Sequence, residues 1–426
     1  MDSDATRAMF SKAMSAMYRR EVPQYGALLD LVSEINRDVL QHDPAIAAEV
    51  ARSGDRERLD QERHGAIRVG TAAELRLLRR MFAVMGMVPV GYYDLSAAGL
   101  PVHSTAFRAI DPKALRCSPF RLFVSLLRLD LIADPALRAQ AAGILQRRRI
   151  VTPEALALIE VFEAEGRLDD TQAEAFVAEA LHSFRWHDEA SVDVATYASL
   201  RAAHPLVADI VCFKGPHINH LTPRVLDIDA AQAAMQAHGL AAKDHIEGPP
   251  RRRCQILLRQ TSFKALSEPV RFGAEHFEHT ARFGEIEQRG TALTPAGRAL
   301  YDRLLAQGDP AAFEAFPDDH ETLRRQGLAF YRYVPVADVP LGAQSLDEAI
   351  DAGSVCAVPI LYEDFLPVSA AGIFRSNLGG SPVAPAPASP NALGQGALED
   401  ALGCGILDPM ALYEAESRRS AAAITL

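Results

Sequence analysis

The spacing of apolar residues predicts a helical N-terminal segment over residues 1–55. Apolar side chains recur there at intervals of three and four residues, which is the period of an amphipathic helix. They are Met9, Phe10, Met14, Met17 and Tyr18, followed by Leu28, Leu29, Leu31, Val32 and Ile35. The pattern ends at the charged stretch SGDRERLDQER. We expect this segment to pack against the rest of the protein rather than to carry chemistry.

The pattern over residues 56–129 predicts a strand, a helix and then three strands. His64–Gly70 has the alternation of an extended segment, and the helix after it begins with the capping box Thr71-Ala-Ala-Glu74. Gly86 provides the usual C-terminal stop of that helix. The stretches MVPVGYYDL, PVHSTAFRAI and SPFRLFVSLL are each typical of strands. These residues therefore predict a βαβββ module.

The same order of elements returns after an interruption. Residues 130–200 are rich in Ala, Leu and Glu at helical spacing and predict a helical insertion. Over residues 201–290, HINHLTPRVL predicts a strand and IDAAQAAMQAH a helix, and KDHIEG, CQILLRQTSF and TARFGEIEQRG predict three more strands. We infer an internal duplication and an α+β fold, in which two βαβββ modules form one curled central sheet.

Residues 291–426 predict a C-terminal segment of helices and strands, which we expect to close the functional site. LTPAGRALYDRLLAQG has the pattern of a capped helix, and LAFYRYVPV and VCAVPILYEDFLPV have the pattern of strands. The capped helix is also typical of winged-helix regulators. The acidic charge of the chain counts against that alternative, because DNA binding needs a basic surface.

Composition and charge exclude two kinds of partner. The 426 residues have a formal net charge of −11, so no general attraction for nucleic acid is expected. No window holds about 18 successive uncharged apolar residues, and the N-terminus lacks a basic stretch followed by an apolar run. We therefore expect a soluble, cytoplasmic protein with no membrane partner. The five cysteines are scattered and never in Cys-x-x-Cys spacing, which favours reduced thiols.

A candidate metal site follows from the duplication, because the first strand of each module carries His-x-x-x-Arg. A shared curled sheet would bring His64 and His220 toward one concave cavity. Glu285 and Glu287 lie on the last predicted strand and share one face at period two, so alternation does not choose between them. Two histidines and one carboxylate are the ligand set of non-haem Fe(II) oxygenases.

Other polar residues have competing interpretations. Arg68 follows His64 by four residues and shares its strand face, where a guanidinium could bind a substrate carboxylate; the alternative is a surface arginine. Arg224 is its counterpart, and we expect it to be structural. The stretch EHFEH offers His276 and His279 as a second metal site, but we expect it to lie in a solvated loop.

Several of these stretches together resemble a known family. ERHGAIRVGT, NHLTPRVLDID, RFGEIEQRG and YEDFLPVSAAGIFRSNL resemble the 2-oxoadipate dioxygenase/decarboxylase family, a branch of the vicinal-oxygen-chelate superfamily. The resemblance covers roughly residues 1–380. It implies Fe(II) held by His64, His220 and Glu287, and only the resemblance favours Glu287 over Glu285. It further implies that Arg68 binds a substrate carboxylate and that Val368 and Ser369 line the substrate pocket.

The activity implied by the resemblance is oxidative decarboxylation. 2-Oxoadipate and O₂ would give 2-hydroxyglutarate and CO₂, in lysine catabolism, and the 2-oxo acid would chelate the metal through its keto oxygen and adjacent carboxylate. Two alternatives remain. One is another divalent-metal enzyme of the same fold, an isomerase or lyase that turns over without O₂; the other is a non-enzymatic metabolite-binding regulator. The sequence predicts neither the length of the 2-oxo acid, nor which carboxylate Arg68 binds, nor the oligomeric state.

Overall fold

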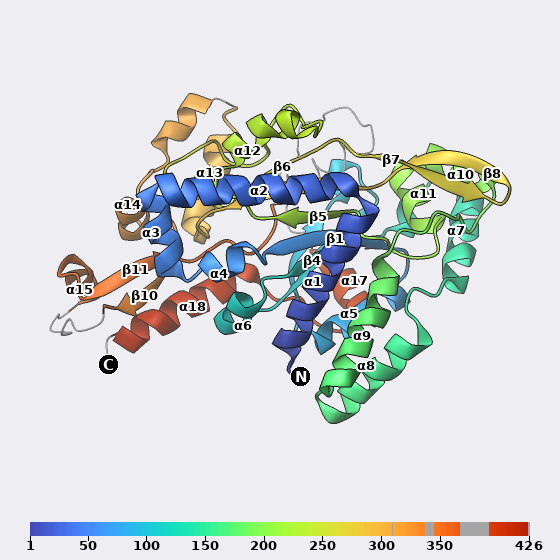
Figure 1. Ribbon diagram of the computed structural model, residues 1–426, viewed down its shortest axis with the longest axis horizontal. Coiled ribbons are helices and arrows are strands. Elements are labelled where there is room, and N and C mark those ends of the chain that lie inside the picture. The colour runs from blue at the N-terminus through green and yellow to red at the C-terminus, as the bar shows by residue number, and fades with distance from the viewer. Residues whose placement is uncertain (309, 337–344, 367–391, 425–426) are drawn as a thin grey trace.

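A curled seven-stranded sheet forms the centre of the protein (Figure 1). The computed structural model describes residues 1–308, 310–336, 345–366 and 392–424. The strand order is β2-β3-β4-β1-β5-β9-β6. The strands are β1 (Arg63–Val69), β2 (Val88–Asp94), β3 (Val102–Arg108), β4 (Arg121–Leu127), β5 (His220–Pro223), β6 (Leu258–Ser262) and β9 (Phe283–Arg289).

The sheet is built from two modules of related topology, the second with one strand fewer than the first. The first contains β1, α5 (Ala72–Val84), β2, β3 and β4, and the second contains β5, α12 (Ile228–Met235), β6 and β9. In each module the last strand pairs parallel with the first, and β1 and β5 join the modules in antiparallel pairing. The predicted α+β fold with duplicated modules is therefore confirmed.

One predicted strand is wrong. The stretch KDHIEG makes one isolated bridge to the sheet, Glu247 with Gln260, and Ala242 just before it makes another with Phe263. The two bridges differ in register, so no regular ladder connects them. Gly248 has a φ of 106° and is followed by two prolines, which lack the N–H that a strand needs. The second module thus has an irregular outer edge where the first module has β2.

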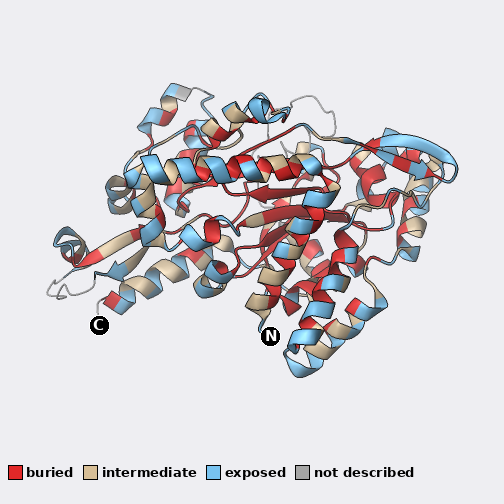
Figure 2. Ribbon diagram, viewed as in Figure 1, coloured by how far each residue is buried: buried red, intermediate tan, exposed pale blue. Residues whose placement is uncertain are grey.

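Helices cover the convex face of the sheet. They include α1 (Ser3–Glu21) and α2 (Pro23–His42), whose apolar side chains join those of the strands in one buried core. Ile67 and Val69 of β1 point into this core, so the alternating residues His64 and Arg68 point to the concave side. A Cβ at Gly284 would lie 2.9 Å from Leu28 Cδ2, which shows how closely α2 approaches β9. The central strands are buried (Figure 2).

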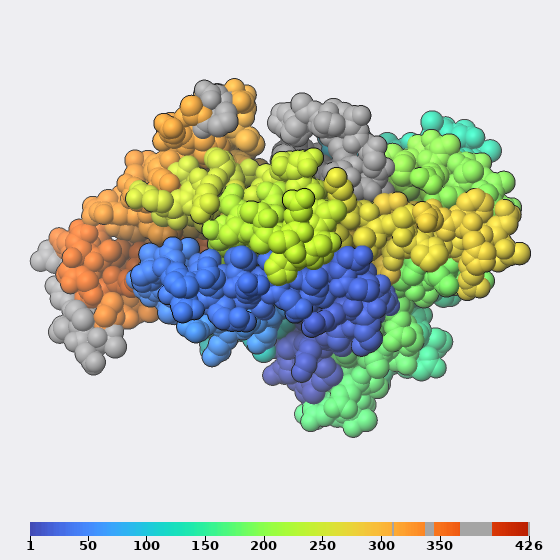
Figure 3. Space-filling model, turned by 45° about the horizontal axis from the view of Figure 1, so that its top comes forward, coloured from blue at the N-terminus to red at the C-terminus, as the bar shows by residue number. Residues whose placement is uncertain are grey.

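Five helices that precede β5 in the chain, and a hairpin that follows it, lie outside the central sheet. The helices are α7 (Pro135–Arg147), α8 (Pro153–Glu165), α9 (Asp170–Ala180), α10 (Val194–Ala203) and α11 (Pro205–Val211), of which α11 lies beyond the predicted insertion of residues 130–200. The hairpin of β7 (Ser267–Phe272) and β8 (Glu275–Thr280) forms a separate two-stranded sheet. β8 is largely exposed and β7 has alternating exposed and buried residues, unlike the buried strands of the central sheet (Figure 2). In Figure 3 the second module, in yellow-green, lies alongside the blue N-terminal helices.

The remaining described elements are another small sheet and further helices. β10 (Tyr331–Pro335) and β11 (Val355–Pro359) form another two-stranded sheet, as the strand patterns of the C-terminal segment predicted. The other α-helices are α3 (Pro44–Ser53), α4 (Arg56–Leu59), α6 (Pro112–Cys117), α13 (Pro295–Leu305), α14 (His320–Arg325), α15 (Leu346–Asp351), α17 (Ala392–Leu402) and α18 (Pro409–Ile424). Short 3-10 helices lie at Ser96–Ala98, Leu129–Leu131, Leu181–Phe184, Gln236–His238 and Pro310–Ala315. Within the described ranges, every helix is too short or too polar to span a bilayer.

Candidate metal centre

The two histidines of the repeated motif lie side by side on the concave face. Antiparallel pairing of β1 with β5 places His64 opposite Thr222 and Ala66 opposite His220. The histidines are therefore diagonal neighbours on one face, and their ring centroids are 5.5 Å apart. Both residues are buried. The structure thus brings together two of the residues that the sequence suggested as metal ligands.

Glu285 of β9 completes a compact cluster with these histidines. Its Oε1 atom accepts hydrogen bonds from Gln260 Nε2 at 2.6 Å and from the Thr222 hydroxyl at 3.3 Å. The same oxygen lies 3.1 Å from His64 Nε2. One ligand atom from each of His64, His220 and Glu285 lies within 4.8 Å of the other two. Three potential ligands therefore converge at one buried point.

Glu287 lies in the next row of the same strand face and has different partners. Arg289 donates to both of its oxygens, from Nε to Oε1 and from Nη2 to Oε2, each at 2.8 Å. Its Oε2 is also 2.8 Å from His64 Nδ1. Burial alone would raise the pKa of Glu287, but Arg289 and His64 outweigh it and lower the pKa to about 2. Glu287 is therefore an ionised carboxylate. It lies at the Nδ1 edge of the His64 ring, whereas Glu285 lies at the Nε2 edge.

The two imidazoles differ in their electrostatic surroundings. Burial lowers the pKa of His220 well below its ordinary value, and the neighbouring charges of His64, Arg68 and Lys243 lower it further. Burial also disfavours charge on His64, but Glu287 and Glu285 outweigh it and raise its pKa. His220 is consequently held neutral, the state that a metal ligand requires.

The cluster fits a divalent metal ion. His220 Nδ1 and Glu285 Oε2 are buried and have no hydrogen-bond partner among the described residues. Unsatisfied buried polar atoms are rare in folded proteins, and a ligand often accounts for them. Two imidazoles and one carboxylate suit Fe(II) and related divalent ions, with coordination positions left for substrate.

Arg68 belongs to a second polar cluster farther along β1. Its Nη1 donates to Asp209 Oδ2 of α11 at 2.6 Å. Asp209 Oδ1 lies 3.0 Å from His279 Nε2, and His279 Nδ1 lies 2.9 Å from the Tyr197 hydroxyl. Burial would raise the pKa of Asp209, but Arg68 and His217 hold it well below its ordinary range. The expected solvated loop at EHFEH is wrong: the stretch forms β8, because it pairs with β7, and His279 contacts Asp209 rather than the metal cluster.

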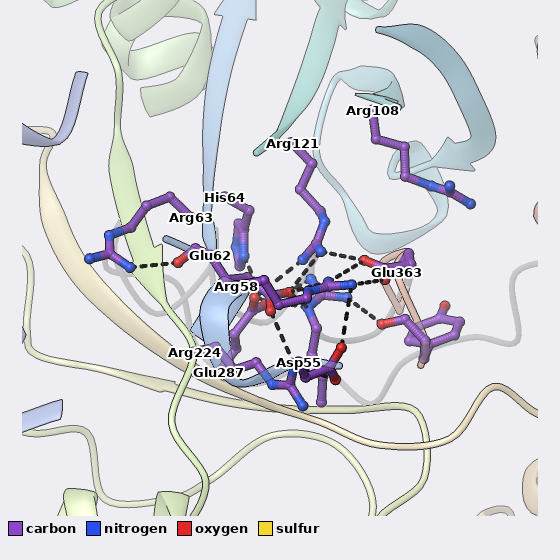
Figure 4. Close-up of polar contacts among 12 residues, drawn as sticks. Asp55, Arg58, Glu62, Arg63, His64, Arg108, Arg121, Arg224, Glu287 and Glu363 are labelled. Atoms are coloured by element: carbon purple, nitrogen blue, oxygen red, sulfur yellow. Dashed lines mark hydrogen bonds and ion pairs between the residues drawn. The ribbon is translucent and has the colours of Figure 1, made fainter. Parts of the chain in front are cut away.

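A buried network of arginines and carboxylates lies next to His64, and the sequence did not predict it (Figure 4). Arg58 donates to both oxygens of Glu363, and Arg121 bonds Glu62 at 2.8 Å. Arg224 bonds Glu62 at 3.2 Å, in keeping with the structural role expected for it. Two features of the sequence could have indicated this network: an arginine inside the apolar strand SPFRLFVSLL and the acidic pair in YEDF.

A cavity of about 1010 Å³ lies beyond this network. Arg58, Arg224, Arg289 and Glu363 are among its lining residues, whereas the three residues of the metal cluster are not. The network therefore separates the cavity from the candidate metal centre. Val368 and Ser369, which the resemblance implied for the substrate pocket, lie outside the described residues.

The chain is similar over nearly its whole length to proteins of one kind. Residues 10–377 match the family described as 2-oxoadipate dioxygenase/decarboxylase. The chain is 54% identical to the 2-oxoadipate dioxygenase/decarboxylase of Pseudomonas putida, covering 98% of this chain and 95% of that protein. It is 52% identical to the protein of the same name from Escherichia coli strain K12, covering 98% and 97%. It also resembles the crystal structure of hydroxyglutarate synthase from Pseudomonas putida in complex with 2-oxoadipate, with 52% identity, a TM-score of 0.93 and coverage of 100% and 99%.

Proposed function

Because the chain belongs to the 2-oxoadipate dioxygenase/decarboxylase family, we propose that it converts 2-oxoadipate and O₂ to 2-hydroxyglutarate and CO₂ with Fe(II) as its metal. The observation that carries this proposal is the buried cluster of His64, His220 and Glu285. A donor set of two nitrogens and one oxygen would leave coordination positions on a bound ion open for a chelating 2-oxo acid and for O₂. The relatives named above support the choice of substrate.

We propose Glu285 as the carboxylate ligand, although the sequence resemblance favoured Glu287. Glu285 keeps one oxygen without a hydrogen-bond partner among the described residues, whereas Arg289 engages both oxygens of Glu287. The Nε2 edge of His64 faces Glu285 and its Nδ1 edge faces Glu287. A metal-binding imidazole usually has its second nitrogen held by a carboxylate or carbonyl. Glu287 would therefore fix the orientation and basicity of His64.

The bound metal would supply oxygen activation and a chelation site for the keto oxygen and adjacent carboxylate of the substrate. The protein's own residues would position the reactants. His220 stays neutral, and Arg68 would hold a substrate carboxylate. Phe365 packs edge-on against His64, with 4.9 Å between ring centroids, and also contacts Phe123. These aromatic rings would exclude water from one side of the site.

Oxygen-electrode measurements test the reaction. Anaerobically iron-loaded protein is offered 2-oxo acids of increasing length, with and without a second carboxylate, and products are identified by mass. We expect O₂ uptake only with Fe(II) and a 2-oxo diacid, and a hydroxylated diacid product shorter by one carbon. Turnover without O₂ in the presence of Mn²⁺, Co²⁺ or Ni²⁺ would instead indicate an isomerase or lyase.

Paired substitutions test the choice of glutamate. We expect Glu285→Gln to remove metal binding, because it removes a ligand. Glu287→Gln should retain a metal site weakened about 10- to 100-fold, because it disturbs only the orientation of His64. Bound iron is measured by mass spectrometry after gel filtration, with Glu278→Gln on the exposed face of β8 as a control. Loss of iron in Glu287→Gln together with retention in Glu285→Gln would assign the ligand to Glu287.

A further inference from the structure

The hairpin of β7 and β8 lies at one end of the molecule, at the right of Figure 1 and of Figure 3. Its two edges differ. The edge of β7 is covered, because the Arg271 amide donates to the Asp188 carbonyl at 2.7 Å and the Ala190 amide donates to the Arg271 carbonyl at 2.9 Å. Within the described ranges, β8 pairs only with β7. The outer edge of β8 can therefore accept another strand.

The pairing of the hairpin shows which backbone groups of β8 point outward. Arg271 uses its N–H and C=O groups on the side away from β8, and it lies directly opposite His276. In an antiparallel pair, the backbone groups of two opposite residues either point toward each other or both point away. Those of His276 therefore point away from β7, and those of Glu278 do the same by alternation. An open row of this kind is a template for pairing with another chain.

The sequence of β8 does not block such pairing. Edge strands are commonly protected by Lys, Pro or a bulge. The strand EHFEHT contains neither Lys nor Pro, and it pairs with β7 without a shift in register. Its side chains are exposed except at His279. Phe277 is 39% exposed although it is large and apolar, and its ring contacts Phe272 at 5.5 Å between centroids.

The side chains of β8 complement a second copy of the same strand in one register. A two-fold axis makes the two strands antiparallel, and outward-pointing residues must then face each other. With Phe277 opposite its own copy, His276 of each strand faces Glu278 of the other. One oxygen of Glu278 accepts from the Ser267 hydroxyl at 2.7 Å, and its other oxygen can accept from the imidazole. A shift of two residues would instead set His276 opposite His276, or Glu278 opposite Glu278, and like charges across strands are destabilising.

We propose that the protein forms a two-fold symmetric homodimer in which β8 pairs antiparallel with β8 of a second copy, centred on Phe277. The two hairpins then form one continuous sheet. His276 and Glu278 exchange backbone hydrogen bonds across the axis, and each Phe277 ring covers the exposed part of the other. The interface is narrow compared with that of an obligate dimer, so we expect a dissociation constant in the micromolar range. This inference does not depend on the proposed activity.

Analytical ultracentrifugation of the full chain with Glu278→Pro tests the pairing. Proline removes the outward N–H of residue 278, which β7 does not use, so the melting temperature should stay near the wild-type value. The dissociation constant should rise about 10-fold or more, because two symmetry-related hydrogen bonds are lost. A wild-type protein that stays monomeric well above micromolar concentration, or a dimer unaffected by Glu278→Pro, would overturn the inference.

Charge reversal tests the register without a change in the backbone. His276→Glu places glutamates opposite each other on both sides of the axis, so the dimer should weaken about 10-fold. Adding Glu278→Lys sets opposite charges across the axis again and should restore the dimer. Glu154→Gln, at an exposed position of α8, is the control and should leave the dimer unchanged. Failure of the double variant to restore the dimer would refute the proposed register.

Oxidative cross-linking locates the axis. Phe277→Cys places two thiols opposite each other across the axis, where a disulfide can form, so mild oxidation should link two chains. Glu275→Cys is the matched control, because residue 275 faces His279 of the second copy and its two thiols would lie more than about 7 Å apart. Wild-type protein gives the background from the native cysteines. Cross-linking of Glu275→Cys without cross-linking of Phe277→Cys would overturn the inference.

Discussion

The two copies of His-x-x-x-Arg occupy equivalent places in the two modules but have different surroundings. Burial lowers the pKa of both imidazoles, but the two glutamates beside His64 outweigh it and raise the pKa of His64, whereas positively charged neighbours lower the pKa of His220 further. Because β1 and β5 are antiparallel, Arg68 and Arg224 lie at opposite ends of the concave face. Arg68 binds Asp209 beside two imidazoles, and Arg224 joins the arginine and carboxylate network.

This difference shows how a duplicated fold supports one asymmetric site. The repeated backbone places two imidazoles next to each other. The residues that differ between the copies then decide what each motif does. Glu285 and Glu287 come from the second module only, and Glu62 precedes only the first histidine motif. The backbone arrangement is thus duplicated, whereas the chemical roles of the two histidine motifs differ.

The largest expected effect is loss of iron binding, and we expect it on substitution of the histidine in either copy of the motif. His64→Ala and His220→Ala should each abolish iron binding and iron-dependent O₂ uptake, because each removes one of three protein ligands. Metal content after anaerobic loading and oxygen-electrode rates measure this. His276→Ala, on the exposed part of β8, should retain both properties. Loss of iron in His276→Ala would favour a metal site at EHFEH.

A second pair of substitutions separates the two arginines. Arg224→Met should destabilise the fold by about 3 to 5 kcal/mol, because it breaks a buried ion pair with Glu62. Arg68→Met should cost less stability, since His279 and His217 still contact Asp209, but it should raise the KM for 2-oxoadipate about 10-fold or more. Urea unfolding and kinetics measure the two effects. A similar rise in KM for Arg224→Met would contradict the distinction.

The smallest expected effect is a difference in pH dependence of the metal-free protein. The folded pKa of His220 is lowered, so His220 reduces stability as pH falls below about 6.5, by up to about 1.4 kcal/mol per pH unit. The folded pKa of His64 is raised, so its stabilisation is present below about 6.5 and is lost as pH rises through the folded pKa.

Urea unfolding with a chelator, over a series of pH values, measures these slopes. His220→Gln should flatten the acidic side of the stability curve, and His64→Gln should flatten the side above about 6.5. If both variants changed the same side of the curve, the assigned electrostatic surroundings of the two imidazoles would be wrong.

The sequence predicted what depends on local periodicity. Period-two alternation placed His64 and Arg68 on one face, and the repeated order of elements predicted the duplicated modules. Alternation could not choose between Glu285 and Glu287, because both share a face; their partners depend on pairing with β5 and β6. The pair of Arg58 with Glu363 joins residues 305 positions apart, which no local pattern reveals. KDHIEG failed as a strand because the two bridges at this edge differ in register, and Gly248 and the two prolines after it end the segment.

Anomalous diffraction at the iron absorption edge, from crystals loaded anaerobically with Fe(II), tests the central claim most directly. We predict one strong peak within bonding distance of His64, His220 and Glu285, with Glu287 against the other nitrogen of His64. Stoichiometric iron bound elsewhere in the protein, or a peak that contacts neither histidine, would contradict this account.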